Sequence, residues 1–234
     1  MQAGNALYET IADLPLSLPV FPLAEALLLP RTQLPLNVFE PRYVDMIDAA
    51  LSSNRLIAMV QPALGYSESI YEEAFGKPAV PPLETVGCVG RLTSFQEMGD
   101  GRYLITLQGI CRFQIVQELA ATQSFRRVEC DYSRFVGDLQ VGSGEENVDR
   151  DGLLRTLRSY LDANDLEADW DSIAEAETEI LVNALCAMSP YGPKEKQALL
   201  EALDLSTRAE TLIAITEMEL AKSRGSNEGG STLQ

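Results

Sequence analysis

The chain has 234 residues, of which 46% are hydrophobic and 23% charged, and these values are typical of a globular protein rather than a disordered or fibrous one. Its 18 Lys and Arg residues stand against 35 Asp and Glu residues, and the net charge of −17 disfavours general nucleic-acid binding. The absence of histidine excludes Ser-His-Asp and Cys-His catalysis and any histidine-ligated metal.

The sequence predicts neither a membrane span nor a signal peptide. The longest apolar region, 14–36, is interrupted by five prolines, whereas a spanning helix needs about 20 apolar residues in succession. The N-terminal residues lack a basic segment followed by an apolar one. The four cysteines form no CxxC pair, which favours reduced thiols, no metal and a cytoplasmic location (Cys88, Cys111, Cys130 and Cys186).

The first half of the chain, from about residue 16 to 135, has the period-two alternation of β-strands. The alternation is clear in three segments (103–108, 111–116 and 127–132). Gly99-Asp100-Gly101 has the composition of a tight turn and predicts a β-hairpin. Residues 56–60 are almost all apolar, so we expect a strand buried on both faces.

One helix and one long connection interrupt this half. Pro41 suits a first helical position, and apolar residues follow at helical spacing, so we expect a helix over about 41–52. The segment 62–84 is rich in proline and glycine and too long for a simple connection, which is typical of functional or disordered loops. Its aromatic residues either bind a partner or fold back onto the strands (Tyr66, Tyr71 and Phe75).

After residue 136 the composition changes, and we interpret the Gly-, Ser- and acid-rich residues 137–147 as a linker. The hydrophobic period then becomes 3.6, which predicts four helices (around 153–161, 170–188 and 198–203, and from Thr207). Proline ends the second helix at Pro190, and Thr207 with Glu210 has the spacing of a capping box. The sequence thus predicts four parts (a β-rich domain 1–136, a linker 137–147, a helical domain 148–223 and a disordered tail 224–234).

Acidic residues concentrate in 138–180, a segment that contains 13 Asp and Glu residues but only three arginines. A solvated helical surface that keeps the protein in solution accounts for this excess. The alternative is a docking surface for a basic partner.

Several segments, taken in order, resemble the N-terminal substrate-binding domain of Lon proteases. They include LPVFPL, LLLP and LPLNVFEPRY near the start, VGCVGRL and a G-x-x-R-F pattern in the middle, and PKEKQALLE near the end (18–23, 27–30, 34–43, 86–92, 109–113 and 193–201). The resemblance covers about residues 16–222 and implies an α+β fold, with a PUA-like β-barrel followed by a helical bundle. The periodicity by itself predicts only a β-rich half and then an α-rich half.

Two positions depart from that family. Arg31 stands where the family commonly has glycine after proline, so we expect a turn that does not depend on glycine. Asn37 stands where the family often has histidine. Neither change affects the elements that we expect.

The resemblance also shows what this chain lacks, because full Lon proteases carry ATPase and Ser-Lys protease modules. The sequence has no G-x-x-x-x-G-K-[ST] phosphate loop. Its lysines lie in loop, helix or tail contexts that offer a serine no desolvated base (Lys77, Lys194, Lys196 and Lys222). We therefore expect a stand-alone recognition domain that is not an enzyme and binds no cofactor.

The candidate binding residues are the aromatic residues of the long loop and Arg42. Arg42 belongs to the patch Glu40-Pro41-Arg42-Tyr43. It either pairs with a carboxylate or with carbonyl groups and so locks the helix to the barrel, or it presents donors to a peptide terminus. Arg91 and Arg112 allow the same two interpretations. We interpret three cysteines as small buried residues and Trp170 as a core anchor of the bundle (Cys88, Cys111 and Cys130).

The sequence leads to one functional hypothesis and one alternative. The hypothesis is a polypeptide-recognition module that acts as an adaptor or regulator of proteolysis. Its partner would be unfolded polypeptide or another protein, such as a separate ATP-dependent protease. The alternative is a small-ligand or RNA-binding PUA-like module, which rests on fold analogy and is opposed by the negative charge.

Overall fold

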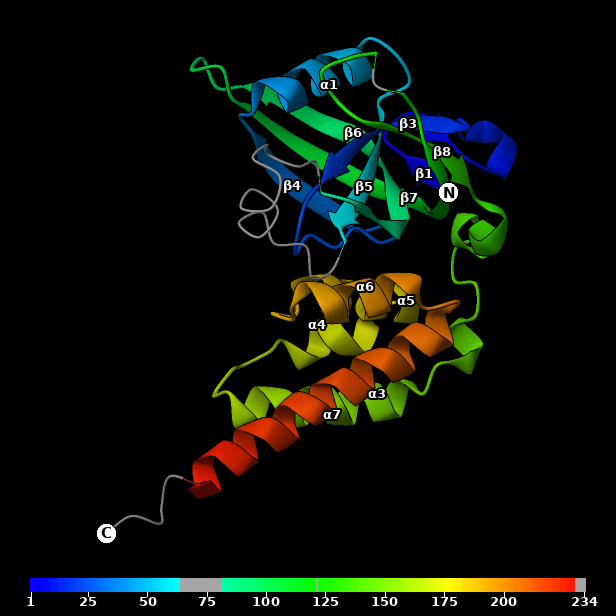
Figure 1. Ribbon diagram of the computed structural model, residues 1–234. Coiled ribbons are helices and arrows are strands. Elements are labelled where there is room, and N and C mark those ends of the chain that lie inside the picture. The colour runs from blue at the N-terminus through cyan, green and yellow to red at the C-terminus, as the bar shows by residue number, and fades with distance from the viewer. Residues whose placement is uncertain (64–80, 121, 230–234) are drawn as a thin grey trace.

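The computed structural model describes residues 1–63, 81–120 and 122–229, with side chains as far as residue 222. A β-barrel occupies one end of the molecule, and a layer of helices lies beneath it (Figure 1). The order of the two halves along the chain is the one that the hydrophobic periodicity predicts.

Five strands close the barrel, in the order β7-β6-β5-β3-β8 and back to β7. The alternating segments lie in β7 and β8, and the continuous apolar run lies in β5 (β3 Ser17–Pro22, β5 Leu56–Pro62, β6 Leu83–Glu97, β7 Tyr103–Glu118 and β8 Arg127–Asp131). β3 and β5 are parallel, whereas the other pairs in the ring are antiparallel. β4 (Gln33–Val38) adds to the first half of β7 outside the ring.

The predicted hairpin is confirmed, because β6 and β7 are joined through the turn around Asp100. Gly99 and Gly101 there have φ values of 75° and 85°, which glycine adopts without strain. The predicted buried strand is also confirmed, since β5 is buried from Leu56 through Gln61. A short pair of strands and a 3₁₀ turn precede the barrel (β1 Gln2–Ala3, β2 Ala6–Leu7 and η1 Ile11–Asp13).

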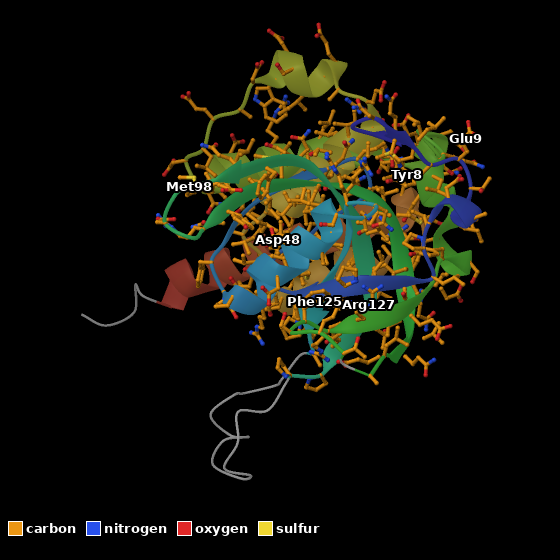
Figure 2. All side chains as sticks on the ribbon, turned by 90° about the horizontal axis from the view of Figure 1, so that it is seen from above. Tyr8, Glu9, Asp48, Met98, Phe125 and Arg127 are labelled. Carbon is orange, nitrogen blue, oxygen red and sulfur yellow. The ribbon has the colours of Figure 1, made fainter. Side chains whose placement is uncertain are left out.

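The helix predicted over 41–52 is α1 (Pro41–Leu51), and it lies across the end of the barrel that faces away from the other helices (Figure 1). One face of α1 is buried, including Tyr43, whose ring packs at a tilt against that of Phe21 of β3, with 4.5 Å between the ring centroids. On the outer side, the Tyr103 hydroxyl of β7 donates to Asp48 of α1 at 3.1 Å. Figure 2 shows Asp48 above the barrel, with Met98 at the far tip of the β6–β7 hairpin.

The G-x-x-R-F pattern of β7 has a clear structural basis. A Cβ atom at Gly109 would clash with the carbonyl oxygen of Leu29, so only glycine fits there. Arg112 is 2% exposed and Phe113 is fully buried in the core. All four cysteines are buried free thiols, as the sequence predicts for three of them (Cys88, Cys111, Cys130 and Cys186).

The helical half contains short 3₁₀ turns and a set of α-helices (η2 Ser133–Leu139, η3 Glu145–Asn147, α3 Arg150–Ala163, α4 Trp170–Glu175, α5 Thr178–Met188, α6 Pro193–Glu201 and α7 Leu205–Gly229). The helix α7 runs beside α3 and extends past Arg224, where we expected a disordered tail to begin. Asp204 caps α7 by accepting from the Thr207 amide at 2.8 Å, so the predicted capping box of Thr207 and Glu210 is wrong.

The prediction of one continuous helix over 170–188 is also wrong, because α4 ends before α5 begins. The Arg150 guanidinium donates to the carbonyl oxygens of Ile173 and Ala174, at 2.9 and 3.2 Å, and so satisfies the end of α4. The Glu179 amide at the start of α5 donates to Glu145 at 2.6 Å. Both partners lie outside the segment, so its own periodicity does not show the break.

The segment 137–147 connects the two halves and contacts both. Asp138 is buried and accepts from the Arg112 amide and from its Nε at 2.9 Å, and from Nη2 at 2.8 Å. The same guanidinium donates to the carbonyl oxygens of Leu200 at 3.0 Å and of Ala202. Arg112 therefore holds the barrel, this segment and the end of α6 together, while the division into two folding domains stays a prediction.

Arg31 makes a second connection between the halves. Its φ of +67° is in the left-handed region that favours glycine. The side chain donates from Nη1 to the Asp138 carbonyl oxygen at 2.8 Å and forms an ion pair with Glu179 of α5. The turn therefore forms without glycine, as expected, but it keeps the backbone conformation that glycine would favour.

Candidate functional site

Of the four predicted binding residues, the structure describes only Arg42. The aromatic residues of the long loop lie outside the described residues (Tyr66, Tyr71 and Phe75). Arg42 is 52% exposed and pairs with its neighbour Glu40, at 2.8 Å from Nη2 to Oε2. Its guanidinium carbon lies 4.6 Å from the ring centroid of Tyr43. These contacts stay within the patch: Arg42 pairs with a carboxylate, as the structural interpretation expects, and this carboxylate belongs to the residue that precedes α1.

The other two arginines that we singled out have structural partners. Arg91 donates to the Asn54 carbonyl oxygen at 2.8 Å and to the Tyr8 hydroxyl at 3.2 Å. Arg112 is buried in the connection described above. These contacts agree with the structural interpretation of both side chains.

Trp170 is not the core anchor that we expected. It is only half-buried and lies outside the hydrophobic core, and the Arg158 guanidinium covers its ring at 4.4 Å from the centroid. The helix α4 that carries Trp170 is a short one, and all its residues are exposed or half-buried. Its tryptophan therefore packs at the surface of the bundle.

An apolar groove lies in the helical half, where α3, the end of α5 and α7 meet. Its volume is about 320 Å³, and mostly apolar side chains line it (Leu153, Thr156, Leu157, Tyr160, Leu161, Leu166, Leu185, Met188, Ser189, Pro190, Tyr191, Leu212 and Thr216). We call these residues the apolar groove. Met188 is 81% exposed and Leu166 is 52% exposed, so large apolar side chains at this site face water.

Local sequence features place these two exposed residues. The helix α5 ends at Met188 because Ser189 is extended and Pro190 follows it. After α3, Asp165 adopts a φ of +53°, and the Leu166 amide then donates back to the Leu161 carbonyl oxygen at 2.9 Å. This turn places Leu166 among the residues that line the groove.

The polar groups at the base of the groove already have partners. The hydroxyls of Tyr191 and Thr216 are hydrogen-bonded to each other at 2.7 Å. Thr216 also bonds the Leu212 carbonyl oxygen at 2.7 Å. Burial raises the pKa of Tyr191, so its hydroxyl stays protonated at neutral pH. The groove thus offers a ligand mainly hydrophobic contact.

The described residues show little reactive chemistry. Among them, no group of three or more Cys, Asp and Glu side chains is arranged to hold a metal ion. Burial raises the pKa of the Cys88 and Cys186 thiols to about 12, so both are protonated and unreactive at neutral pH. Within the same residues, no helix combines the length and the apolar character that a membrane crossing requires.

Comparison with protein families gives one match that spans most of the chain. The model of the ATP-dependent protease La (LON) substrate-binding domain matches residues 17–217. Two similar relatives are Lon protease 2 of Myxococcus xanthus, 25% identical over 87% of this chain, and Lon protease 2 of Sorangium cellulosum, 26% identical over 93%. The chain spans only about a quarter of these relatives, 24% and 26% of their lengths.

Solved structures share the fold. A Lon N-terminal domain protein from Xanthomonas campestris matches 85% of this chain and 97% of its own, with a TM-score of 0.59 and 20% identity. The N-terminal domain of a Mycobacterium avium complex Lon protease matches 86% of this chain and 98% of its own, with a TM-score of 0.62 and 17% identity. The predicted combination of barrel and helical bundle is therefore confirmed.

Proposed function

Because this chain belongs to the family of LON substrate-binding domains, we propose that it binds segments of other polypeptides and catalyses no reaction itself. The match to the substrate-binding domain over residues 17–217 carries this proposal. Such a module would act as an adaptor or a regulator of proteolysis. A reducing, cytoplasmic location suits its four unpaired cysteines.

The apolar groove supports binding of this kind. Exposed apolar side chains gathered in a concave site are typical of protein interaction surfaces. Met188 supports it further, because methionine is flexible and adapts to partners of different shape. We propose that apolar side chains of an unfolded polypeptide enter this groove, and that Arg42 and the three loop aromatics are further binding residues (Tyr66, Tyr71 and Phe75).

The experiment compares two exposed methionines of the helical half. Met188 lines the groove, whereas Met218 of α7 is 61% exposed and lies outside it. We expect Met188→Asp to weaken binding of fluorescently labelled, unfolded casein at least tenfold in an anisotropy titration. Burying a methionine side chain contributes about 1.5–3 kcal/mol, and about 1.4 kcal/mol corresponds to one decade in Kd.

The matched control is Met218→Asp, which adds the same charge and should leave casein affinity within about twofold of the wild type. Both variants should melt close to the wild type, because both side chains are exposed. Equal affinity of all three proteins would refute the groove as the binding site. Cleavage of the casein by the pure protein, with or without ATP, would refute the non-catalytic role.

A further inference from the structure

A second hollow adjoins the apolar groove and is acidic. Its volume is about 220 Å³, and its carboxylates are Glu195 of α6 and Glu219 of α7. Three residues line both the hollow and the groove, so the two form one continuous surface (Tyr160, Pro190 and Tyr191). We call Glu195, Glu219 and the space between them the acidic hollow.

Both carboxylates act on one cation of the chain itself. The Lys222 ammonium lies 2.6 Å from Glu219 Oε1. The hydrogen bond to Glu219, its charge and the charge of Glu195 together raise the pKa of Lys222. The ion pair is exposed, at 64% for Lys222, so it contributes little stability and exchanges readily with another cation.

The charge of the molecule as a whole also favours cations over anions. Thirteen acidic residues and three arginines occupy 138–180, which includes α3 and its neighbours, and the net charge of the whole chain is −17. A cleft with acidic walls raises the local concentration of cations and repels anions. Opposite charges at the rim of an interface favour the correct partner, and like charges disfavour the wrong one.

From this juxtaposition we propose that the apolar groove and the acidic hollow together select unfolded segments in which Lys or Arg closely follows an apolar anchor. The inference rests on the proposed function and specifies its substrate class. An extended chain advances about 3.3 Å per residue, so a basic residue within roughly three positions of the anchor reaches the adjoining hollow. The ammonium or guanidinium then replaces Lys222 beside Glu219.

The test uses three labelled twelve-residue peptides with the same Leu-Met centre. They differ only at two positions beside that centre, which hold Arg, Gln or Glu. We expect the intact protein to bind the Arg peptide at least tenfold more tightly than the Glu peptide, with the Gln peptide between them. The preference should shrink in high salt, because salt screens exposed charges.

Two double variants locate the preference. Glu195→Gln with Glu219→Gln should remove most of the difference between the Arg and Gln peptides. The control, Glu210→Gln with Glu217→Gln, changes two exposed carboxylates of the described α7 that do not line the acidic hollow, and it should keep the difference. Thermal melting of both variants checks that they are folded.

The possible outcomes separate the inference from the proposed function. Equal binding of all three peptides to the wild type would overturn the charge selection and leave polypeptide recognition standing. A preference for Arg that survives Glu195→Gln with Glu219→Gln would overturn the acidic hollow as its cause. If casein and all three peptides fail to bind, both the inference and the proposed function are refuted.

Discussion

Single residues carry the connection between the barrel and the helices, and their partners come from distant parts of the chain. Arg112 lies on a strand that the alternation predicts, but its partner Asp138 lies in a segment whose composition indicates a linker. Arg31 likewise pairs with Glu179, 148 positions away. Local patterns predict on which element each residue lies, whereas the pairing depends on how the elements pack.

Arg31 offers a test of whether the ion pair outweighs the backbone cost. Arg31→Gly relieves a left-handed conformation that costs about 1 kcal/mol. It also leaves Glu179 buried without a cation, at 6% exposure, and breaking a buried pair costs about 3–5 kcal/mol. We expect a net loss of about 2 kcal/mol or more in the free energy of unfolding, measured with urea.

The control adds Glu179→Gln to Arg31→Gly, which removes the orphaned charge and should recover part of the loss. Measuring Glu179→Gln alone completes the cycle. If Arg31→Gly is as stable as the wild type, the ion pair stabilises the fold by no more than the left-handed backbone of Arg31 destabilises it.

At the scale of the elements, the periodicity predicts the helices better than their ends. Apolar residues at helical spacing predict α3, α6 and α7, and Pro190 marks the end of α5. The break between α4 and α5 is missed because Arg150 and Glu145, which satisfy the two ends, are neither in the helices nor near them in sequence. The cap of α7 is missed because Asp204 lies three residues before the predicted start.

The cap at Asp204 predicts a pH dependence. The Thr207 amide donates to the carboxylate and holds the pKa of Asp204 below its usual value of 3.8. A carboxyl whose pKa is lowered by folding stabilises the fold above the unfolded pKa, and this contribution is lost as the pH falls through the folded pKa. Asp204→Ala should therefore cost about 1 kcal/mol at pH 7, and less in strong acid.

Thermal unfolding of the wild type and Asp204→Ala at pH 7 and below pH 3.8 measures this difference. Asp204→Asn is the matched control, because its amide oxygen accepts the same hydrogen bond and does not titrate. A gap between the wild type and Asp204→Ala that stays constant with pH would show that the carboxylate charge has no part in the cap.

For the whole molecule, the question is how independent the two halves are. Gln61 of β5 donates to Gln197 of α6 at 3.1 Å, and Arg112 reaches the carbonyl oxygens at the end of the same helix. The buried apolar residues of both halves form one continuous core. The closure of the barrel could be predicted only from the family resemblance, because periodicity does not show which strands pair.

A fragment comprising residues 1–140 tests the predicted division into domains. It retains Asp138 for Arg112 but lacks the acceptors on Leu200 and Ala202. We expect dispersed amide NMR signals, typical of a folded barrel, and a melting temperature several degrees below that of the full chain. Loss of the dispersion would show that barrel and helices form a single folding unit.

The groove illustrates the limit of sequence reasoning at this scale. Met188 shares the helical stripe of Leu181 and Leu185, and the pattern places all three in the core. Leu181 is buried, but Met188 is 81% exposed because α5 ends there and nothing among the described residues covers it. Periodicity shows which face of a helix is apolar. The packing of the neighbouring helices decides how much of the length of that face is covered.

Hydrogen–deuterium exchange with and without excess unfolded casein tests polypeptide binding in the groove most directly. A bound segment shields the surface and reduces local opening, so exchange should slow where the groove is lined. We predict slower amide exchange in the segments 153–166, 185–191 and 212–216 and little change in the strands of the barrel. Slowing confined to the barrel, or no change in exchange at saturating casein, would contradict the account.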